Sequence, residues 1–508
     1  MNVAWKTNLA SGLKWDLVAN LAGVAWPSLL QFAFVPLYLK KLGIDAFGLI
    51  GFYLMTQAVV SILDFGLSPT VNREMARYSV QPHKAAEARD LVRTVESGYW
   101  LIGFASGAII IVASHAIATH WIKPGSVSAA EVQRAIRLIG VLVALQWPIS
   151  FYQGGLMGLG HQVLCNGVNI CFSTISSTGS LCVLYLISPT IHALFLWLVI
   201  LTAMETTLIA ALLWRNLPKS DRPSRFDKAR LQSIRAFAAG MTGITLCSLL
   251  LMQSDKLIIS KLFSLGTLGY YSLAGMFGSG LSMIVTSVFN TIFPRFSALA
   301  AVNEEELRNL YFRSTQLLAV LIFPLAAVMS VFSNQILQIW TRNAEIARNA
   351  GPIMTLLVIG SALNGLSNTP YALQLAYGWT SLPLRINIFI AAISVPGAWL
   401  LANHFGPLGA ACVWPGLNVI YMVIAVPLTH RRLLKGEAVR WYAEAALPLV
   451  AILPIVFLGR VVVTNSMSMF STVVTLMALL LFATGGAAFI SPSIRPWLLN
   501  QLERAKMA

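Results

Sequence analysis

The chain has 508 residues, of which 57% are hydrophobic and 11% charged, and its mean hydropathy is +0.73. Roughly a quarter of the residues in an ordinary soluble domain are charged, so the composition excludes that class. The apolar residues form runs near the roughly 20 residues of a spanning helix and do not alternate, which excludes a β-barrel. Backbone groups find no water in a bilayer core, so the sequence predicts an all-α polytopic membrane protein.

The net charge of +16 comes from 35 basic and 19 acidic residues. In a soluble protein this excess would indicate nucleic acid. In a membrane protein, Lys and Arg accumulate in cytoplasmic loops, where they set topology and face anionic phospholipid. We therefore expect anionic phospholipid, and no nucleic acid, among the partners.

The apolar runs predict about fourteen spans. A Gly-rich turn at 154–162 separates the fourth span from the fifth, residues around Pro189 separate the fifth from the sixth, and the sixth ends near Trp214. Further turns are expected at Gly43, Gly378 and Gly406. The remaining spans are placed at about 16–39, 47–72, 97–117, 136–156, 236–263, 267–293, 314–336, 351–377, 385–403, 407–428, 445–463 and 470–490.

The distribution of Lys and Arg predicts the topology. Most of them fall in alternate loops, which places both termini in the cytoplasm and requires an even number of spans, without deciding between fourteen and twelve. The most basic loop, which contains Arg215, Arg222 and Arg235, divides the chain nearly in half. We predict an N-terminal lobe at 1–214, a cytoplasmic linker at 215–235, a C-terminal lobe at 236–430, and an additional helix pair with a cytoplasmic tail at 431–508.

An internal repeat relates the two predicted lobes. A shift of about 221 residues aligns KLGIDAFGLI at 41–50 with KLFSLGTLGYY at 261–271 and places Gly48 on Gly269. The same shift places Gln153 on Gln374. The repeat predicts two pseudo-symmetric six-helix lobes in parallel orientation about an axis normal to the membrane, with the substrate path between them.

Enzyme signatures are missing from the sequence. It has no G-x-x-x-x-G-K-[ST], no H-E-x-x-H and no G-x-S-x-G, and no C-x-x-C among its five cysteines. We therefore expect a transporter with no metal and no organic cofactor. The outer loops are short, which argues against a membrane-embedded glycan polymerase or ligase.

Three acidic residues in predicted spans are candidates for coupling or for a counter-charge: Asp64, Glu205 and Asp255. An ionisable group costs about 2.5–3.5 kcal/mol near the centre of a helix, so those that persist are expected to face a cavity or the bundle interior. For Glu205 the alternatives are a proton or cation relay and a carboxyl satisfied by neighbouring Thr and Ser. Asp255 is adjacent to Lys256, so the two side chains diverge by about 100° and need other partners.

Five basic residues are candidates to line a substrate cavity: Arg73, Lys256, Arg295, Arg313 and Arg385. Arg73 follows Asp64 by nine residues and cannot pair with it on an ideal helix; it could instead be the first cytoplasmic anchor. Lys256 could reach the outer interface with its flexible stem. The remaining three stand at predicted inner helix ends, where ordinary positive-inside anchoring competes with a role at an inward-open mouth.

The motifs ILDFGLSPTVNREMAR at 62–77, QSDKLIISKLFSLGTLGYYSLA at 253–274 and FPRFSAL at 293–299 resemble the Wzx-like polysaccharide (O-antigen) flippases. These belong to the superfamily that also holds the multidrug and toxin extrusion antiporters and the lipid II flippases. The resemblance covers about 8–432. Twelve spans are common in such flippases, so fourteen would be a departure.

This resemblance implies that an undecaprenyl-diphosphate-linked oligosaccharide is moved from the cytoplasmic to the periplasmic leaflet of the bacterial inner membrane by alternating access. It implies a cationic cavity, coupling to H⁺ or Na⁺, and polysaccharide polymerase or glycosyltransferase partners. The alternatives are a multidrug/cation antiporter, which should have acidic residues in its cavity, and a membrane-embedded glycan polymerase or ligase.

Overall fold

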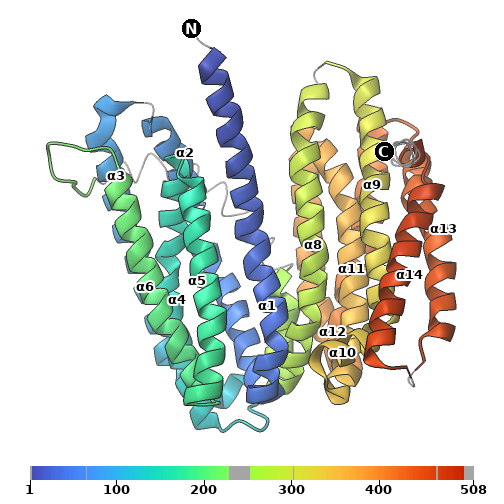
Figure 1. The fold of residues 1–508 in the computed structure, drawn as a ribbon, viewed down its shortest axis with the longest axis horizontal. Helices are drawn as coiled ribbons and strands as arrows, with labels where there is room; N and C mark the ends of the chain where they lie inside the picture. Colours follow the sequence, from blue (N-terminus) through green and yellow to red (C-terminus); the bar gives the residue numbers. More distant parts are fainter. Residues whose placement is uncertain are drawn as a thin grey trace. The chain divides into compact units, whose positions relative to one another are not determined.

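The computed structural model describes residues 3–64, 66–79, 81–227, 252–300, 302–464 and 467–496. In these ranges the regular structure is helical, apart from one isolated β-bridge between Lys123 and Ser264 (Figure 1). Eleven helices in the described part are long and apolar enough to cross a membrane. The prediction of an all-α polytopic membrane protein is confirmed.

The helices follow the predicted spans closely. Residues 252–262 are helical as well, whereas 236–251, the start of the predicted seventh span, lie outside the described residues. The bounds are α1 Val3–Val60, α2 Leu67–Ser79, α3 Ala85–Ala116, α4 Ala129–Gly158, α5 Gln162–Cys182, α6 Ile191–Asn216, α8 Leu265–Leu299, α9 Glu304–Val331, α10 Ser333–Thr341, α11 Ala344–Ala376, α12 Ser381–Leu433, α13 Ala438–Val462 and α14 Met469–Ile490.

Glycine divides the two longest helices at the predicted turns. Gly43 in α1 has φ 76° and Gly406 in α12 has φ 66°, and both are non-helical. Residues with a Cβ rarely adopt this left-handed region, whereas glycine does so at little cost. Each of these long helices therefore contains two predicted spans.

The predicted second span, 47–72, is wrong at its end. The helix stops at Val60, Ser61–Asp64 form a 3₁₀ turn, and Gly66 has φ 70°. The separate helix α2 follows, with Val71, Met75 and Tyr78 buried on one face. This spacing is typical of a helix that packs one side against the protein and exposes the other. The segment after Gly66 is therefore a separate amphipathic helix and not the end of the predicted second span. Much of the predicted basic loop after it is also helical, because α3 begins at Ala85.

By internal contacts the chain forms two compact units. Unit one comprises Met1–Leu249 and Phe263–Gly269, and unit two comprises Leu250–Leu262 and Tyr270–Ala508. An aromatic cluster that includes Tyr99, Phe151 and Tyr152 lies in the core of unit one. Tyr271, Tyr311 and Trp441 are fully buried in unit two. The predicted divisions at 1–214, 215–235, 236–430 and 431–508 stay predictions, and residues 228–235 and 497–508 lie outside the described residues.

The first part of the basic linker is held against α3. The Arg222 guanidinium forms an ion pair with the buried Asp90 carboxylate, whose other oxygen accepts the Arg225 backbone N–H at 2.8 Å. The Asp227 N–H donates to the Thr94 hydroxyl at 2.9 Å. Because Asp90 is buried, these partners satisfy a carboxylate that would otherwise be costly. The linker therefore leaves α6 along a defined path.

The two glycines aligned by the repeat lie at close backbone contacts inside unit one. A Cβ on Gly48 would lie 2.1 Å from the Leu265 carbonyl oxygen, and one on Gly269 would lie 2.5 Å from the Ile44 carbonyl oxygen. Ile44 and Leu265 are related by the same shift as the two glycines. The two contacts are thus reciprocal, as in an isologous two-fold interface. This supports the predicted repeat.

We predict that Gly48→Ala and Gly269→Ala each destabilise the protein by about 1–3 kcal/mol, because the new methyl group meets backbone that cannot rotate away. The measurement is thermal unfolding of the purified protein in detergent. Gly275→Ala on α8 is the matched control, because a Cβ there meets nothing within 4 Å. Equal midpoints for Gly48→Ala and Gly275→Ala would show that the close contact does not constrain the fold.

Candidate functional site

Unit one contains an open cavity of about 910 Å³ with a mixed polar and apolar lining. Its walls come from α1, α4, α5 and α6, and from the segment around the 3₁₀ turn before α2. Two of the predicted coupling residues, Asp64 and Glu205, line it. The break in the predicted second span brings Asp64 to this wall, because the chain turns there and does not continue as a helix.

Asp64 is half-buried and hydrogen-bonded. Its carboxylate accepts the Tyr99 hydroxyl and, at 3.4 Å, the Ser68 backbone N–H. Tyr99 is buried in the aromatic core, so it holds the carboxylate from a fixed position. Asp64 therefore lines the cavity while it is hydrogen-bonded to a residue of the core.

Glu205 lies on α6 and is half-buried, with no hydrogen bond or ion pair from its carboxylate to any described residue. The neighbouring Thr206 hydroxyl donates to the carbonyl oxygens of Leu145 and Thr202, and that of Thr207 to Ala203. The alternative that neighbouring hydroxyls satisfy Glu205 is therefore not what the structure shows. A carboxylate with no partner, beside a cavity, can take up a proton or bind a cation.

Neutral amides and hydroxyls share the rest of the lining with apolar side chains such as Leu54, Trp147 and Phe172. Gln146 accepts the Tyr53 hydroxyl at 2.6 Å, and Gln153 follows Gln146 by two helical turns on α4. Gln31, Gln57 and Asn169 contribute further amides. Such oxygens suit a hard cation such as Na⁺, although the described residues hold no cluster of three His, Cys, Asp or Glu that could bind a metal. These amides are not among the site residues predicted from the sequence; the spacing of Gln146 and Gln153 on one face of a helix is the signal that indicates them.

Asp255 and Lys256 separate as predicted in unit two. The Asp255 carboxylate accepts the Tyr271 hydroxyl at 2.7 Å and the Lys256 backbone N–H at 2.7 Å. Tyr271 is fully buried, so this bond gives Asp255 a structural partner. The Lys256 side chain is half-buried and has no ion pair with a described residue.

Arg73 lies apart from the cavity of unit one. It is on α2, with 53% of its side chain exposed, and its guanidinium pairs with the adjacent Glu74 at 2.9 Å. Glu74 also pairs with Arg77. The structure therefore does not bring Asp64 and Arg73 to one cavity wall.

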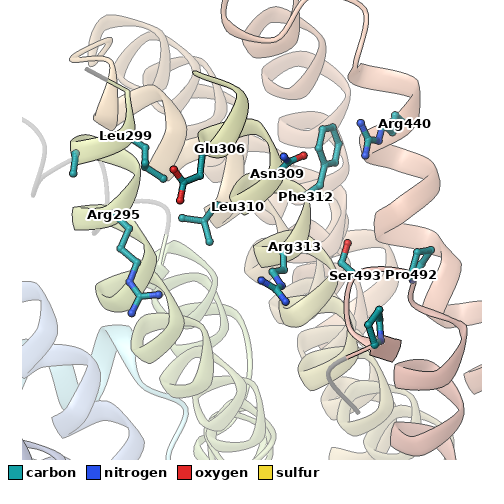
Figure 2. A pocket seen from close by; sticks show the side chains of 12 residues that line it. Arg295, Leu299, Glu306, Asn309, Leu310, Phe312, Arg313, Arg440, Pro492 and Ser493 are labelled. Carbon is teal, nitrogen blue, oxygen red and sulfur yellow. The ribbon is translucent and has the colours of Figure 1, made fainter. Parts of the chain in front are cut away.

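Arg295 and Arg313 line a second cavity, of about 610 Å³, in unit two (Figure 2). Arg295 comes from the end of α8 and Arg313 from the first part of α9. Arg440 on α13 and the segment after α14 complete the wall. Arg385, near the start of α12, is exposed and is not among the lining residues.

The polysaccharide biosynthesis protein family matches residues 42–341. A candidate O-antigen transporter of Shigella flexneri is 23% identical over 418 residues, which cover 82% of this chain and 97% of that protein. The resemblance inferred from the three motifs is confirmed.

Two solved structures share the fold. A multidrug resistance transporter of the MATE family, in an inward-facing conformation, has a TM-score of 0.70 and 13% identity, covering 82% of this chain and 98% of its own. Lipid II flippase MurJ, in an inward closed conformation, has a TM-score of 0.67 and 11% identity, covering 94% and 98%. At these identities the likeness shows the fold of the chain and not its substrate.

We predict that Tyr271→Phe lowers the unfolding free energy by about 1–3 kcal/mol, because Asp255 loses its buried hydroxyl donor. Thermal unfolding measures this loss. Tyr270→Phe is the control, since the hydrogen bond from the Tyr270 hydroxyl to Glu345 is long, at 3.3 Å, and lies at an exposed position. Loss of transport by Tyr271→Phe with no change in stability would contradict the structural role of the bond.

Proposed function

The chain belongs to the polysaccharide biosynthesis protein family, and from this we propose that it is a secondary flippase for an undecaprenyl-diphosphate-linked oligosaccharide. It moves this substrate from the cytoplasmic to the periplasmic leaflet by alternating access. The Shigella relative, described as a transporter of O-antigen, supports the substrate class. The fold shared with lipid II flippase MurJ supports a carrier for a lipid-linked glycan.

The proposed location is the bacterial inner membrane, with both termini in the cytoplasm. The excess of basic residues in alternate loops supports this orientation. The proposed partners are the enzymes that make and extend the glycan, namely glycosyltransferases and a polysaccharide polymerase.

The observation that carries the coupling proposal is the carboxylate of Glu205, which lines the cavity of unit one and has no hydrogen bond or ion pair with a described residue. A carboxylate that binds a proton or Na⁺ in one state of the cycle and releases it in the other supplies differential binding between the two states. Asp64 lines the same cavity and gives the site a second negative charge. We therefore assign coupling to Asp64 and Glu205.

A multidrug/cation antiporter is the second candidate, and one observation favours it. The described lining of the unit-one cavity contains Asp64 and Glu205 but neither Lys nor Arg, which is the acidic cavity expected of an antiporter. The cavity of unit two is lined by three arginines and one glutamate, which suits an anionic substrate. The flippase accounts for both cavities, with a cation at one and an anionic group at the other.

The test of the flippase is deletion of the gene. Surface polysaccharide is expected to fall, and the lipid-linked oligosaccharide is expected to accumulate on the cytoplasmic side, where a membrane-impermeant glycosidase or label added outside cannot reach it. Restoration by the plasmid-borne gene is the control. Unchanged polysaccharide with no accumulated intermediate would refute the function. Turnover of the lipid-linked sugar by the purified protein without transport would instead identify a membrane-embedded enzyme.

We predict that Glu205→Gln reduces polysaccharide export about tenfold or more, because a neutral amide of the same shape cannot take up the coupling proton or cation. Export in the complemented deletion strain, at matched protein levels, measures the effect. Asp221→Asn, at an exposed linker position, is the matched control and should export normally. Full export by Glu205→Gln would refute the coupling role of Glu205, whereas the flippase proposal would still stand.

A further inference from the structure

A further cavity, of about 640 Å³, lies at the end of unit two that is opposite the C-terminal segment (Figure 1). One wall is the short helix α10 with the residues that follow it. The other wall is formed by Thr464 and Met467, which lie between α13 and α14, and by the start of α14. We call it the α10 cavity. It shares no lining residue with the two cavities described above.

Helix α10 turns two amides toward this cavity. Ser333 and Leu337 are its buried residues, whereas Gln335 and Gln338 line the cavity. Their spacing of three residues places the two amides next to each other on one face of the helix. Neither amide has a hydrogen bond with a described residue. Two neighbouring amides offer both donors and acceptors, which is what the hydroxyl groups of a ligand require.

Arg342 follows α10 with an unusual backbone conformation. In the described part of the chain it is the only residue other than glycine with a positive φ, at 53°. Its N–H donates to the Gln338 carbonyl oxygen at 2.8 Å, and the adjacent Asn343 caps α11 by accepting the Ile346 N–H at 3.1 Å. Glycine would serve this turn at a lower cost. Strain of this kind concentrates at ligand sites, which draws attention to the side chain of Arg342.

Both walls of the α10 cavity favour a negative charge. Arg342 is exposed, it is the only ionisable residue in the described lining, and its guanidinium has no hydrogen bond or ion pair with a described residue. On the opposite wall, the Ser468 hydroxyl oxygen caps α14 by accepting the Ser471 N–H at 3.1 Å. The beginning of a helix carries a partial positive charge. A ligand between the walls would therefore meet positive potential from both sides.

The neutral polar groups outnumber the single charge. Besides the two amides of α10, the hydroxyl-bearing residues Thr464 and Thr472 line the cavity. A guanidinium matches the two oxygens of a carboxylate, and amides match hydroxyls. Met467 and Met469 add adaptable apolar surface, which suits the C–H face of a sugar ring. The volume lies within the usual range of ligand pockets. An acidic sugar combines one carboxylate, several hydroxyls and an apolar ring face.

We propose that the α10 cavity binds a carboxylate-bearing sugar residue of a glycan, with the Arg342 guanidinium on the carboxylate and the amides of Gln335 and Gln338 on ring hydroxyls. The inference rests on the proposed function for the orientation of the chain, which places this end of unit two at the periplasmic side. Sugar recognition at this end is separate from the cavity that contains Glu205.

The test is binding of small glycosides to the purified full-length protein in detergent, measured by saturation-transfer difference NMR. Methyl β-D-glucuronide is the probe, methyl β-D-glucoside lacks its charge, and acetate lacks its hydroxyls. The glucuronide is expected to bind about tenfold or more tightly than the glucoside, since a contact to a charged group is worth about that factor. Acetate should also bind more weakly than the glucuronide. Equal affinity for acetate and glucuronide, or binding of a short acidic peptide in place of the glucuronide, would overturn the proposal.

Arg342→Gln is expected to weaken binding of the glucuronide about tenfold or more and to leave binding of the glucoside unchanged. Arg460→Gln is the matched control, because Arg460 is exposed in the last turn of α13 but does not line the cavity. Unchanged affinity in Arg342→Gln, or an equal loss in Arg460→Gln, would overturn the proposal.

Arg342→Gly separates binding from stability. Glycine accepts the positive φ and removes the guanidinium, so this variant should lose the glucuronide while its thermal midpoint stays equal to that of the wild type or rises. A purely structural role of Arg342 would not produce this combination. A lower midpoint together with retained binding would overturn the proposal.

Binding is measured without transport, so the two proposals fail separately. Binding of the glucuronide with no accumulation of lipid-linked oligosaccharide in the deletion strain would refute the flippase and keep the sugar site. Accumulation in the deletion strain with no binding of the glucuronide would refute the sugar site and keep the flippase.

Discussion

The cost of holding a charge away from water is the constraint on which the rest of this structure depends. The buried carboxylates Asp90 and Glu96 of unit one are each stabilised by hydrogen-bond or ion-pair partners. Asp90 is met by Arg222 of the linker, and Glu96 accepts the Tyr152 hydroxyl at 2.8 Å and the Trp214 indole N–H at 3.0 Å. These contacts join α3, α4, α6 and the linker. The same hydrogen bonds and ion pair that stabilise the buried carboxylates therefore also hold these elements together. Glu205 departs from this rule, because it lines a cavity and its carboxylate has no hydrogen bond or ion pair with a described residue.

The two units use charge in opposite ways. The cavity of unit one combines two carboxylates with neutral amides and hydroxyls, which suits a proton or a small cation. The cavity of unit two is lined by Arg295, Arg313 and Arg440 together with Glu306, a net positive set that suits an anion. The described ionisable lining of each cavity thus has an excess of one sign of charge, negative in unit one and positive in unit two.

The helices could be predicted from the sequence because apolar runs and glycine turns are local signals. Gly43 and Gly406 have the positive φ that their positions between spans suggested. The end of the second span was missed because the apolar run continues to Leu67, and Gly66 was the signal that it turns. The cavities are harder to predict from the sequence, because their lining residues come from helices that are distant in the chain. The lining also includes neutral amides, which a pattern of charged residues does not reveal. For Arg73 the sequence leaves open a role in lining a cavity and a role as a cytoplasmic anchor; the structure pairs it with the adjacent Glu74, and it is not among the lining residues of the unit-one cavity.

The reciprocal glycine contacts have a consequence for ancestry. Gly48 packs on Leu265 and Gly269 packs on Ile44, and one shift along the chain converts the first pair into the second. A homodimer of a half-length chain would make this contact twice by symmetry, with one glycine serving both sides. In a single chain the two contacts are no longer identical by symmetry, yet both positions still hold glycine and both face a backbone carbonyl oxygen.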